Sequence, residues 1–246
     1  MRKNLVISCV GPDSLHKSWS KANRNFDLFL CYYGDIKNLY NEDADCYFEK
    51  KGTKFNIIAD LDLANKYEYI FVPDDDLLMD CDDINRLFDL AKKHDLWVCQ
   101  PSIMGYYSVH QTLHHPGCVL RYTNWVEIMC PCFSNYAFEV CQKTFNYSKS
   151  CWGVEKLWNK KLGNPKDKIA IIDDVIAQHT RPCFAGDNYT NNNIEKPEND
   201  LFKVIEDNDL EWDIKIYSKL DKKISDLPHD MRHYPPIKFF QQRKLF

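Results

Sequence analysis

The chain has 246 residues, of which 44% are hydrophobic and 14% aromatic, so it can bury a substantial core and is not a disordered protein. Its formal net charge of -4 gives no basic surface for nucleic acid, and we expect no nucleic-acid partner. Eleven cysteines are scattered through the chain without the spacing of a zinc finger, which disfavours a structural zinc site and indicates a reducing compartment.

The first hundred residues alternate short apolar runs with segments of helical spacing. The apolar runs predict strands over residues 5–10, 26–33, 69–72 and 96–99. Helical spacing predicts a helix over 57–67, and a second helix that includes 87–91 begins after Asp82-Asp83, which we expect to form its N-cap. Continuous apolar strands joined by helices indicate an α/β sheet covered on both faces.

The rest of the chain divides near residue 190. Before that point we expect strands over 119–122, 125–129, 169–172 and 175–178, and helices over 135–145 and 154–162. Beyond it the composition turns to Asn, Glu, Asp, Lys and Pro. The sequence therefore predicts a main domain over 1–190 and an irregular, partly helical C-terminal extension over 191–246 that packs on the domain or forms a tail.

Neither end of the chain has the pattern of a membrane-spanning segment. The N-terminal apolar run has only six residues, too few for a signal peptide, and no stretch approaches the roughly 18 apolar residues of a transmembrane helix. Together with the cysteines, this predicts a cytoplasmic protein. Residues 238–246 mix basic and aromatic side chains, and we expect them either to dock on the domain or to make a weak contact with a membrane surface.

Three consecutive carboxylates, Asp74, Asp75 and Asp76, directly follow the strand predicted over 69–72. Ligands of open α/β sheets bind at the carboxyl ends of strands, and alternate carboxylates such as Asp74 and Asp76 can turn toward one cation. Oxygen ligands suit Mn²⁺ or Mg²⁺, which take further ligands from water and substrate phosphates. The alternative is a solvated turn that caps the next helix.

The strand and acidic run, preceded by segment 52–58, resemble the GT-A glycosyltransferase superfamily. The resemblance implies an α/β fold of GT-A type, in which the Asp motif binds the metal ion of a nucleotide-sugar and a basic residue, here Lys54, lies near the nucleotide. Segments 124–134, 152–155 and 171–179 resemble, in order and spacing, an uncharacterised GT-A-like family of plants and bacteria, the domain of unknown function 707. The resemblance covers about residues 4–190, which we expect to form the catalytic domain.

Two polar residues follow the strand predicted over 175–178. His179 ends this run, and its neutral imidazole can supply a third metal ligand, as the resemblance also implies; the alternative is a partly buried histidine bonded to the backbone. Arg181 can pair with diphosphate oxygens through its planar guanidinium, or it can anchor the loop to an acidic neighbour.

Two glutamates are candidates for the catalytic base. Glu155 follows Trp152-Gly153, as does the carboxylate that deprotonates the acceptor hydroxyl in several inverting GT-A families, but it also fits a first-turn glutamate favoured by the helix dipole. Glu127 is the rival base or a ligand of the acceptor hydroxyl. Trp125 and Trp152 can each offer an apolar face to a sugar ring or pack in the core.

The nucleotide has candidate contacts on several predicted elements. The end of the first strand, at Val10, and Tyr33 can meet the base, although Tyr33 fits a plain strand aromatic equally well. Lys54 can reach the phosphates as a mobile charge, and Asp75 is expected to contact the donor sugar or the backbone.

These features predict a metal-dependent glycosyltransferase, a hexosyl- or pentosyltransferase that uses a nucleotide-sugar, UDP-linked by family tendency. The acceptor would be a glycan or another hydroxyl compound, and the reaction would invert the anomeric centre. A nucleotidyltransferase or phosphoester hydrolase on the same metal site is the first alternative. A non-catalytic glycan-binding module, in which the acidic run only caps a helix, is the second.

Overall fold

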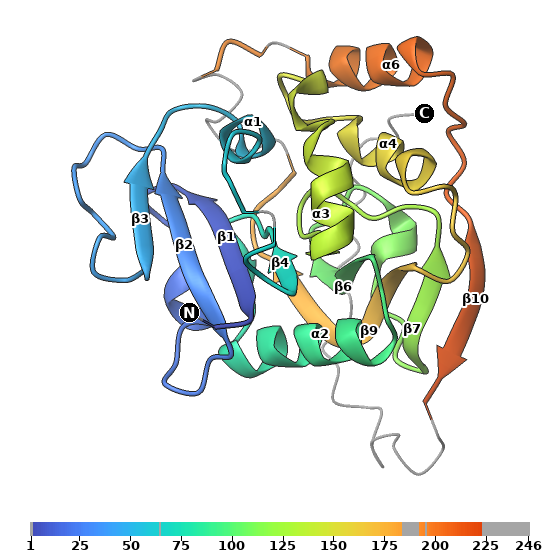
Figure 1. Ribbon diagram of the computed structural model, residues 1–246, viewed down its shortest axis with the longest axis horizontal. Coiled ribbons are helices and arrows are strands. Elements are labelled where there is room, and N and C mark those ends of the chain that lie inside the picture. Colours follow the sequence, from blue (N-terminus) through green and yellow to red (C-terminus); the bar gives the residue numbers. More distant parts are fainter. Residues whose placement is uncertain (1, 64, 184–191, 195, 223–246) are drawn as a thin grey trace.

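The computed structural model describes residues 2–63, 65–183, 192–194 and 196–222. The predicted last segment, 238–246, lies outside these residues. The described chain forms one ten-stranded mixed sheet with helices on both faces (Figure 1). In spatial order the strands are β10 (Ile216–Asp221), β7 (Cys118–Thr123), β9 (Ile169–His179), β6 (Val98–Gly105), β8 (Cys132–Ser134), β4 (Tyr69–Phe71), β1 (Asn4–Val10), β2 (Phe26–Tyr32) and β3 (Cys46–Glu49). The short strand β5 (Leu77–Leu78) pairs with β9.

The strands that carry the predicted site run in parallel. β1 pairs in parallel with both β2 and β4, and β6 pairs in parallel with β9. β8 and β7 run the opposite way beside them. Parallel neighbours bring their carboxyl ends to one edge of the sheet, so the segments after β1 and β4 start side by side.

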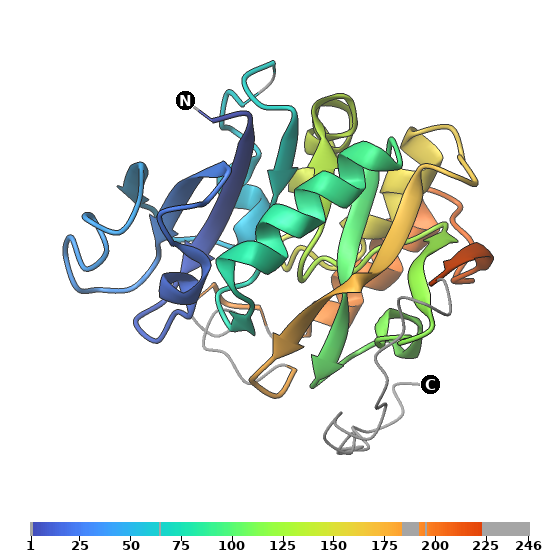
Figure 2. The same cartoon turned by 90° about the horizontal axis from the view of Figure 1, so that it is seen from below.

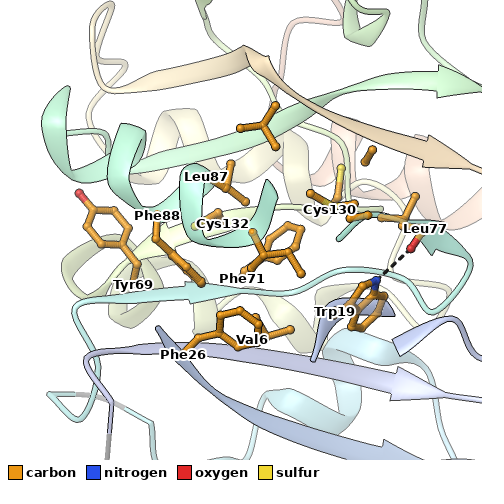
Figure 3. Packing of buried hydrophobic residues seen from close by; sticks show 14 of the residues in the cluster. Val6, Trp19, Phe26, Tyr69, Phe71, Leu77, Leu87, Phe88, Cys130 and Cys132 are labelled. Atoms are coloured by element: carbon orange, nitrogen blue, oxygen red, sulfur yellow. Dashed lines mark hydrogen bonds between the residues drawn. The ribbon is translucent and has the colours of Figure 1, made fainter. Parts of the chain in front are cut away.

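One helix covers one face of the sheet. α2 (Cys81–Lys93) lies across the strands in Figure 2 and packs on alternate strand residues, among them Val6 of β1 and Phe71 of β4 (Figure 3). Asp80 caps this helix. Its carboxylate accepts a hydrogen bond from the backbone N–H of Asp83, and the Asp83 carboxylate accepts one from the backbone N–H of Asp80. The N-cap is therefore Asp80, and the prediction of Asp82-Asp83 as the cap is wrong by two to three residues.

The other face is covered by α1 (Lys54–Ile58), α3 (Asn135–Gln142) and α4 (Val154–Lys161) (Figure 1). Phe55 of α1 and Trp158 of α4 form an aromatic cluster with Phe145, which follows α3 in the chain; the ring centroids are 4.5–6.3 Å apart. Such contacts contribute about 0.5–1.5 kcal/mol per pair beyond area burial. Phe55 thereby fixes the first turn of α1, where Lys54 stands.

Two predicted elements differ from the structure because distant side chains satisfy the backbone. The helix expected over 57–67 ends at Ile58, where the Gln142 amide donates to the carbonyls of Ile58, Ala59 and Leu61. The strand expected over 125–129 is a loop, because the N–H of Glu127 donates to the Gln100 side chain instead of to a neighbouring strand.

Other segments differ in extent. The strand expected over 96–99 is β6, which continues to Gly105, and the two runs over 169–178 form the single strand β9. Between Ile172 and Ile176 the register against β6 shifts, so residues 173–175 bulge from the ladder. Three short 3-10 helices, η1 (His16–Trp19), η2 (His110–Thr112) and η3 (Phe145–Tyr147), complete the core region.

The described part of the C-terminal extension is ordered against the main domain. α6 (Pro197–Asp207) packs near α4, where Gly153 approaches Leu201 and Val204 so closely that a Cβ would lie 3.0–3.3 Å from them. β10 then joins the sheet beside β7. No helix in the described ranges is both long and apolar enough to cross a membrane.

The cap of α2 gives a direct stability test. Asp80→Ala removes the carboxylate that accepts the N–H of Asp83, and we expect a loss of about 1 kcal/mol in the free energy of unfolding, measured by urea denaturation. Asp89→Ala, on the exposed side of the same helix, is the matched control and should change it by less than about 0.5 kcal/mol. Equal effects of the two substitutions would contradict the capping role.

Candidate active site

The acidic run lies at the carboxyl edge of the sheet. β1 ends at Val10 and β4 at Phe71, and the two strands pair in parallel with Val6 opposite Phe71. Gly11 and the acidic run Asp74–Asp76 follow these ends, and the Gly11 N–H donates to Asp75 at 2.7 Å. The structure thus places the predicted motif where open α/β sheets bind their ligands.

Lys54 ties three segments together beneath this edge. Its ammonium nitrogen lies 2.6 Å from Asp74 Oδ1 and also donates to the carbonyls of Ile128 at 2.5 Å and of Val72 and Met129 at 3.3 Å. The lysine side chain is 9% exposed. This geometry anchors the ammonium, so it does not favour the mobile phosphate contact expected from the sequence.

Asp75 points into the protein. Its carboxylate accepts the Gly11 N–H, lies 3.6 Å from Arg181 Nη1, and keeps only 9% of its side chain exposed. Burial raises the pKa of Asp75 to about 6, although the bond from Gly11 opposes this shift. Asp75 therefore fixes the loop after β1 through the backbone N–H of Gly11. This is the predicted backbone contact, and the predicted contact with the donor sugar stays a prediction.

Asp76 and His179 face each other. Leu77 of β5 pairs with His179 of β9, and this pairing brings Asp76 Oδ2 to 3.2 Å from His179 Nε2. The other carboxylate oxygen, Asp76 Oδ1, is buried and has no hydrogen-bond partner among the residues that the structure describes. A buried carboxylate oxygen without a donor is costly unless a further positive group completes its environment.

The ring of His179 is held in one orientation. Its Nδ1 lies 2.9 Å from the carbonyl oxygen of Tyr106, and because a carbonyl only accepts, Nδ1 carries a proton and Nε2 faces Asp76. Gly105 allows this approach: its φ is +88°, and a Cβ there would lie 2.4 Å from the carbonyl oxygen of His179. Burial lowers the pKa of His179, but hydrogen bonds to Asp76 and Cys183 raise it to about 11.

Glu127 is the second carboxylate at this edge. Its backbone N–H is held by Gln100 Oε1 at 2.7 Å, and its Oε1 accepts a short hydrogen bond from the Ser108 hydroxyl. Oε2 is buried and has no hydrogen-bond partner in the described ranges. Burial raises the pKa of Glu127, whereas Ser108 and the nearby His179 lower it. The side chain thus lies within the electrostatic reach of His179, and one of its oxygens has no partner among the described residues.

Glu155 lies at the first turn of α4 and folds back on it. Its Oε2 accepts the N–H of Gly153 at 2.9 Å, the local bond that a first-turn glutamate makes. Burial raises the pKa of Glu155 to about 7, with Lys156 opposing the shift. Of the two readings of Glu155, the geometry favours the helix-start residue over the catalytic base.

The predicted nucleotide contacts surround Gly11. The Val10 side chain is buried in the core, and its carbonyl accepts the N–H of Tyr33. A Cβ on Gly11 would lie 2.6 Å from the Tyr33 hydroxyl, so the phenol ring packs directly over this glycine. Burial raises the pKa of the Tyr33 hydroxyl. Arg181 donates to the Asp13 carbonyl at 2.5 Å and pairs with Asp75, which matches its predicted role as a loop anchor.

The three predicted metal ligands are not equally placed. Asp76 and His179 meet, whereas Asp74 is paired with Lys54. In the described ranges, no group of three or more His, Cys, Asp or Glu side chains is arranged to hold a metal ion. Mg²⁺-type sites commonly use one or two protein ligands with water and substrate phosphates. The free Asp76 Oδ1 and the fixed His179 Nε2 fit that kind of site.

Several residues that shape the site carried little signal in the sequence. Ser108 and Gln100 position Glu127, and Tyr106 and Cys183 contact His179. A polar Gln100 within an apolar strand and a glycine at its end, Gly105, are the two signals that would have pointed to this edge.

Solved structures with similar folds exist, and those described below share 11–12% of their residues with this chain. A structure of residues 1–349 of TarS from S. aureus has a TM-score of 0.51 at 11% identity and covers 72% of this chain and 60% of its own. Full TarS has a TM-score of 0.50 at 12% identity, covering 73% and 37%. A mycobacterial protein has a TM-score of 0.53 at 11% identity, covering 82% and 74%. The chain thus spans 60% of one TarS structure and 37% of the other, which is less than two thirds of each.

These similarities decide the fold. The chain has an α/β fold of the GT-A type, with helices on both faces of the sheet, as the sequence predicted. A provisionally described nucleotide-diphospho-sugar transferase from Desulfovibrio desulfuricans G20 covers 85% of this chain and 96% of its own at 11% identity, but its TM-score of 0.43 is too low to carry an argument. No family model and no curated protein matches the sequence, so the narrower resemblance to the domain of unknown function 707 gains no support.

The raised pKa of Glu155 has a consequence for stability. The folded state holds this proton up to about pH 7, whereas an unfolded glutamate releases it near its ordinary pKa, so folding stability falls as pH rises between those values. Glu155→Gln keeps an acceptor for Gly153 without this titration. The free energy of unfolding of the variant, measured by urea denaturation, should therefore rise relative to that of the parent protein as pH increases. Between pH 4 and pH 8 this difference should grow by about 1–3 kcal/mol.

A constant difference between Glu155→Gln and the parent across that pH range would contradict the buried, protonated state.

Proposed function

We propose that this chain is a metal-dependent glycosyltransferase that moves a sugar from a UDP-sugar, as a hexosyl- or pentosyltransferase, to a hydroxyl of a glycan or another acceptor, with inversion. The observation that carries the proposal is the buried Asp76 Oδ1, which has no donor among the described residues while its carboxylate faces the oriented ring of His179. The GT-A fold supports it as well, because the acidic run stands at the carboxyl edge of the sheet.

In this proposal Asp76 and His179 hold Mn²⁺ or Mg²⁺. The ion, when bound, neutralises the charge that develops on the leaving diphosphate. Tyr106 keeps the proton on Nδ1, which leaves Nε2 available as a ligand once its own proton is displaced. Asp74, which is paired with Lys54, stands beside this pair as a third candidate ligand.

Glu127 is the base in this proposal, in place of Glu155. Its free Oε2 takes the proton of the acceptor hydroxyl while the hydroxyl oxygen attacks the anomeric carbon, and the bond from that carbon to the diphosphate oxygen breaks. Ser108 holds Oε1, so that one carboxylate oxygen is fixed and the other is left for the acceptor. The raised pKa of Glu127 brings it closer to the working pH of a general base.

In this proposal the diphosphate lies beside the acidic run, near Arg181. Arg181 stands 3.6 Å from Asp75, whose carboxylate accepts the N–H of Gly11. A guanidinium that is 37% exposed keeps surface for a phosphate even while it anchors the Asp13 carbonyl.

The metal assignment is tested by calorimetric titration with UDP, with and without Mn²⁺. Binding should require Mn²⁺, and Asp76→Asn should weaken it on the order of 100-fold, because the amide supplies a weaker oxygen and no charge. Asp82→Asn, in the first turn of α2 outside the site, is the control and should bind like the parent. Equal UDP affinity with and without Mn²⁺ would refute the metal site.

The base assignment is tested with nucleotide-sugar donors and an acceptor screen. Glu127→Gln should lower kcat by about 10²–10⁴-fold with little change in UDP binding, because the amide cannot take the acceptor proton. Glu155→Gln should retain most of the activity. A large loss of kcat in Glu155→Gln, with activity retained in Glu127→Gln, would identify Glu155 as the base. Release of pyrophosphate from UTP without sugar transfer would identify a nucleotidyltransferase.

A further inference from the structure

A groove of about 360 Å³ lies away from the acidic run, between α4 and the segment that leads from α6 into β10. This is the side of the molecule where α4, α6, β7 and β10 come together (Figure 1). Asn124 closes one end: its amide donates to the Asp213 carbonyl and accepts the N–H of Lys215, both at 2.8 Å. The C-terminal extension and the main domain therefore build the groove jointly.

The charges around the groove are balanced. Its lining contains three lysines, three carboxylates and three asparagines, so the site has no net preference for an anion or a cation. Balanced charge disfavours a nucleotide, whose phosphates require an excess of cationic groups. A neutral ligand with many hydrogen-bonding groups fits this lining.

Aromatic surface adjoins these polar groups. Trp125 and Tyr217 line the groove, and Lys156 places its ammonium 5.2 Å from the ring of Trp125 and 5.0 Å from that of Trp212. Trp212 is 39% exposed and stacks on Phe202 with ring centroids 6.2 Å apart. An exposed, rigid indole next to hydrogen-bonding side chains suits a ligand that has an apolar face and a polar edge.

Two buried polar atoms of the lining residues need partners of opposite kinds. The indole N–H of Trp125 and the amide oxygen Oδ1 of Asn159 are both without a hydrogen-bond partner in the part of the chain that the structure describes. Trp125 is 5% exposed. A hydroxyl both donates and accepts, so a polyhydroxylated ligand carries a group that can satisfy either atom.

We infer that this groove binds an oligosaccharide, with hydroxyls on the asparagines of the lining and a sugar ring on Trp212, which adjoins the groove beside the lining residue Lys156. The loop after β7 links it to the proposed base: Trp125 lines the groove, Glu127 follows two residues later, and Met129 accepts the N–H of Asp74. From Asn124 to Met129 the chain spans at most roughly 18 Å. A bound chain would thus act as the distal part of the acceptor; that role rests on the proposed function, whereas oligosaccharide binding does not.

The test is saturation-transfer NMR and calorimetry of the full chain with cellohexaose, xylohexaose, maltohexaose and chitohexaose, without UDP or metal. At least one should bind, and Trp212→Ala and Asn159→Leu should each weaken it at least tenfold. Tyr147→Ala removes an aromatic side chain that is 52% exposed and lies outside the groove, and it should bind like the parent. Melting temperatures identify any variant that fails to fold, and Tyr217→Ala then replaces it.

Binding of no hexasaccharide, or binding that survives both Trp212→Ala and Asn159→Leu, would overturn the inference. If the protein binds an oligosaccharide but not UDP, the proposed transferase function is wrong and oligosaccharide binding in the groove stands. If it binds UDP but no oligosaccharide, the proposed function stands and the inference about the groove is wrong.

Discussion

The site depends on one buried cation, the ammonium of Lys54. It donates hydrogen bonds to the Asp74 carboxylate and to the carbonyls of Ile128 and Met129, and so holds the acidic run against the loop that carries Glu127. Burying an ammonium costs several kcal/mol unless it is paired and hydrogen-bonded, and here its acceptors meet both conditions. A substitution that left these groups without a donor would loosen both the acidic run and the loop.

This anchoring divides the acidic run into three roles. Asp74 completes the environment of Lys54, Asp75 turns inward to the Gly11 N–H, and Asp76 faces His179 with one oxygen free. Three neighbouring carboxylates would otherwise repel each other. Asp74 pairs with Lys54, Asp75 with Arg181 and Asp76 with His179, and the buried Asp76 Oδ1 is left without a hydrogen-bond partner within the described chain. The run is therefore a set of distinct contacts and not a uniform cluster of ligands.

Much of the fold was predictable, because apolar runs and their spacing are local properties of the chain. The strands β1, β2, β4 and β7 and the helix α4 follow directly from such runs, and a strand before three carboxylates indicated the edge that holds the site. What could not be predicted depends on partners far apart in sequence. The Gln142 amide binds the carbonyls at the end of α1, and the Gln100 side chain keeps the backbone at Glu127 out of the sheet. The N–H of Gly153 donates to the Glu155 carboxylate and holds it at the start of α4. The same limit applied to Lys54, whose anchoring carbonyls lie 74 and 75 residues away.

The central claim is that Asp76 and His179 hold a divalent cation against a nucleotide diphosphate. The most direct measurement is a crystal structure with UDP and Mn²⁺, with data collected at the manganese absorption edge. The account predicts an anomalous peak about 2.1 Å from both Asp76 Oδ1 and His179 Nε2, with the UDP diphosphate as a further ligand. A bound UDP without such a peak, and with His179 still hydrogen-bonded to Asp76, would contradict it.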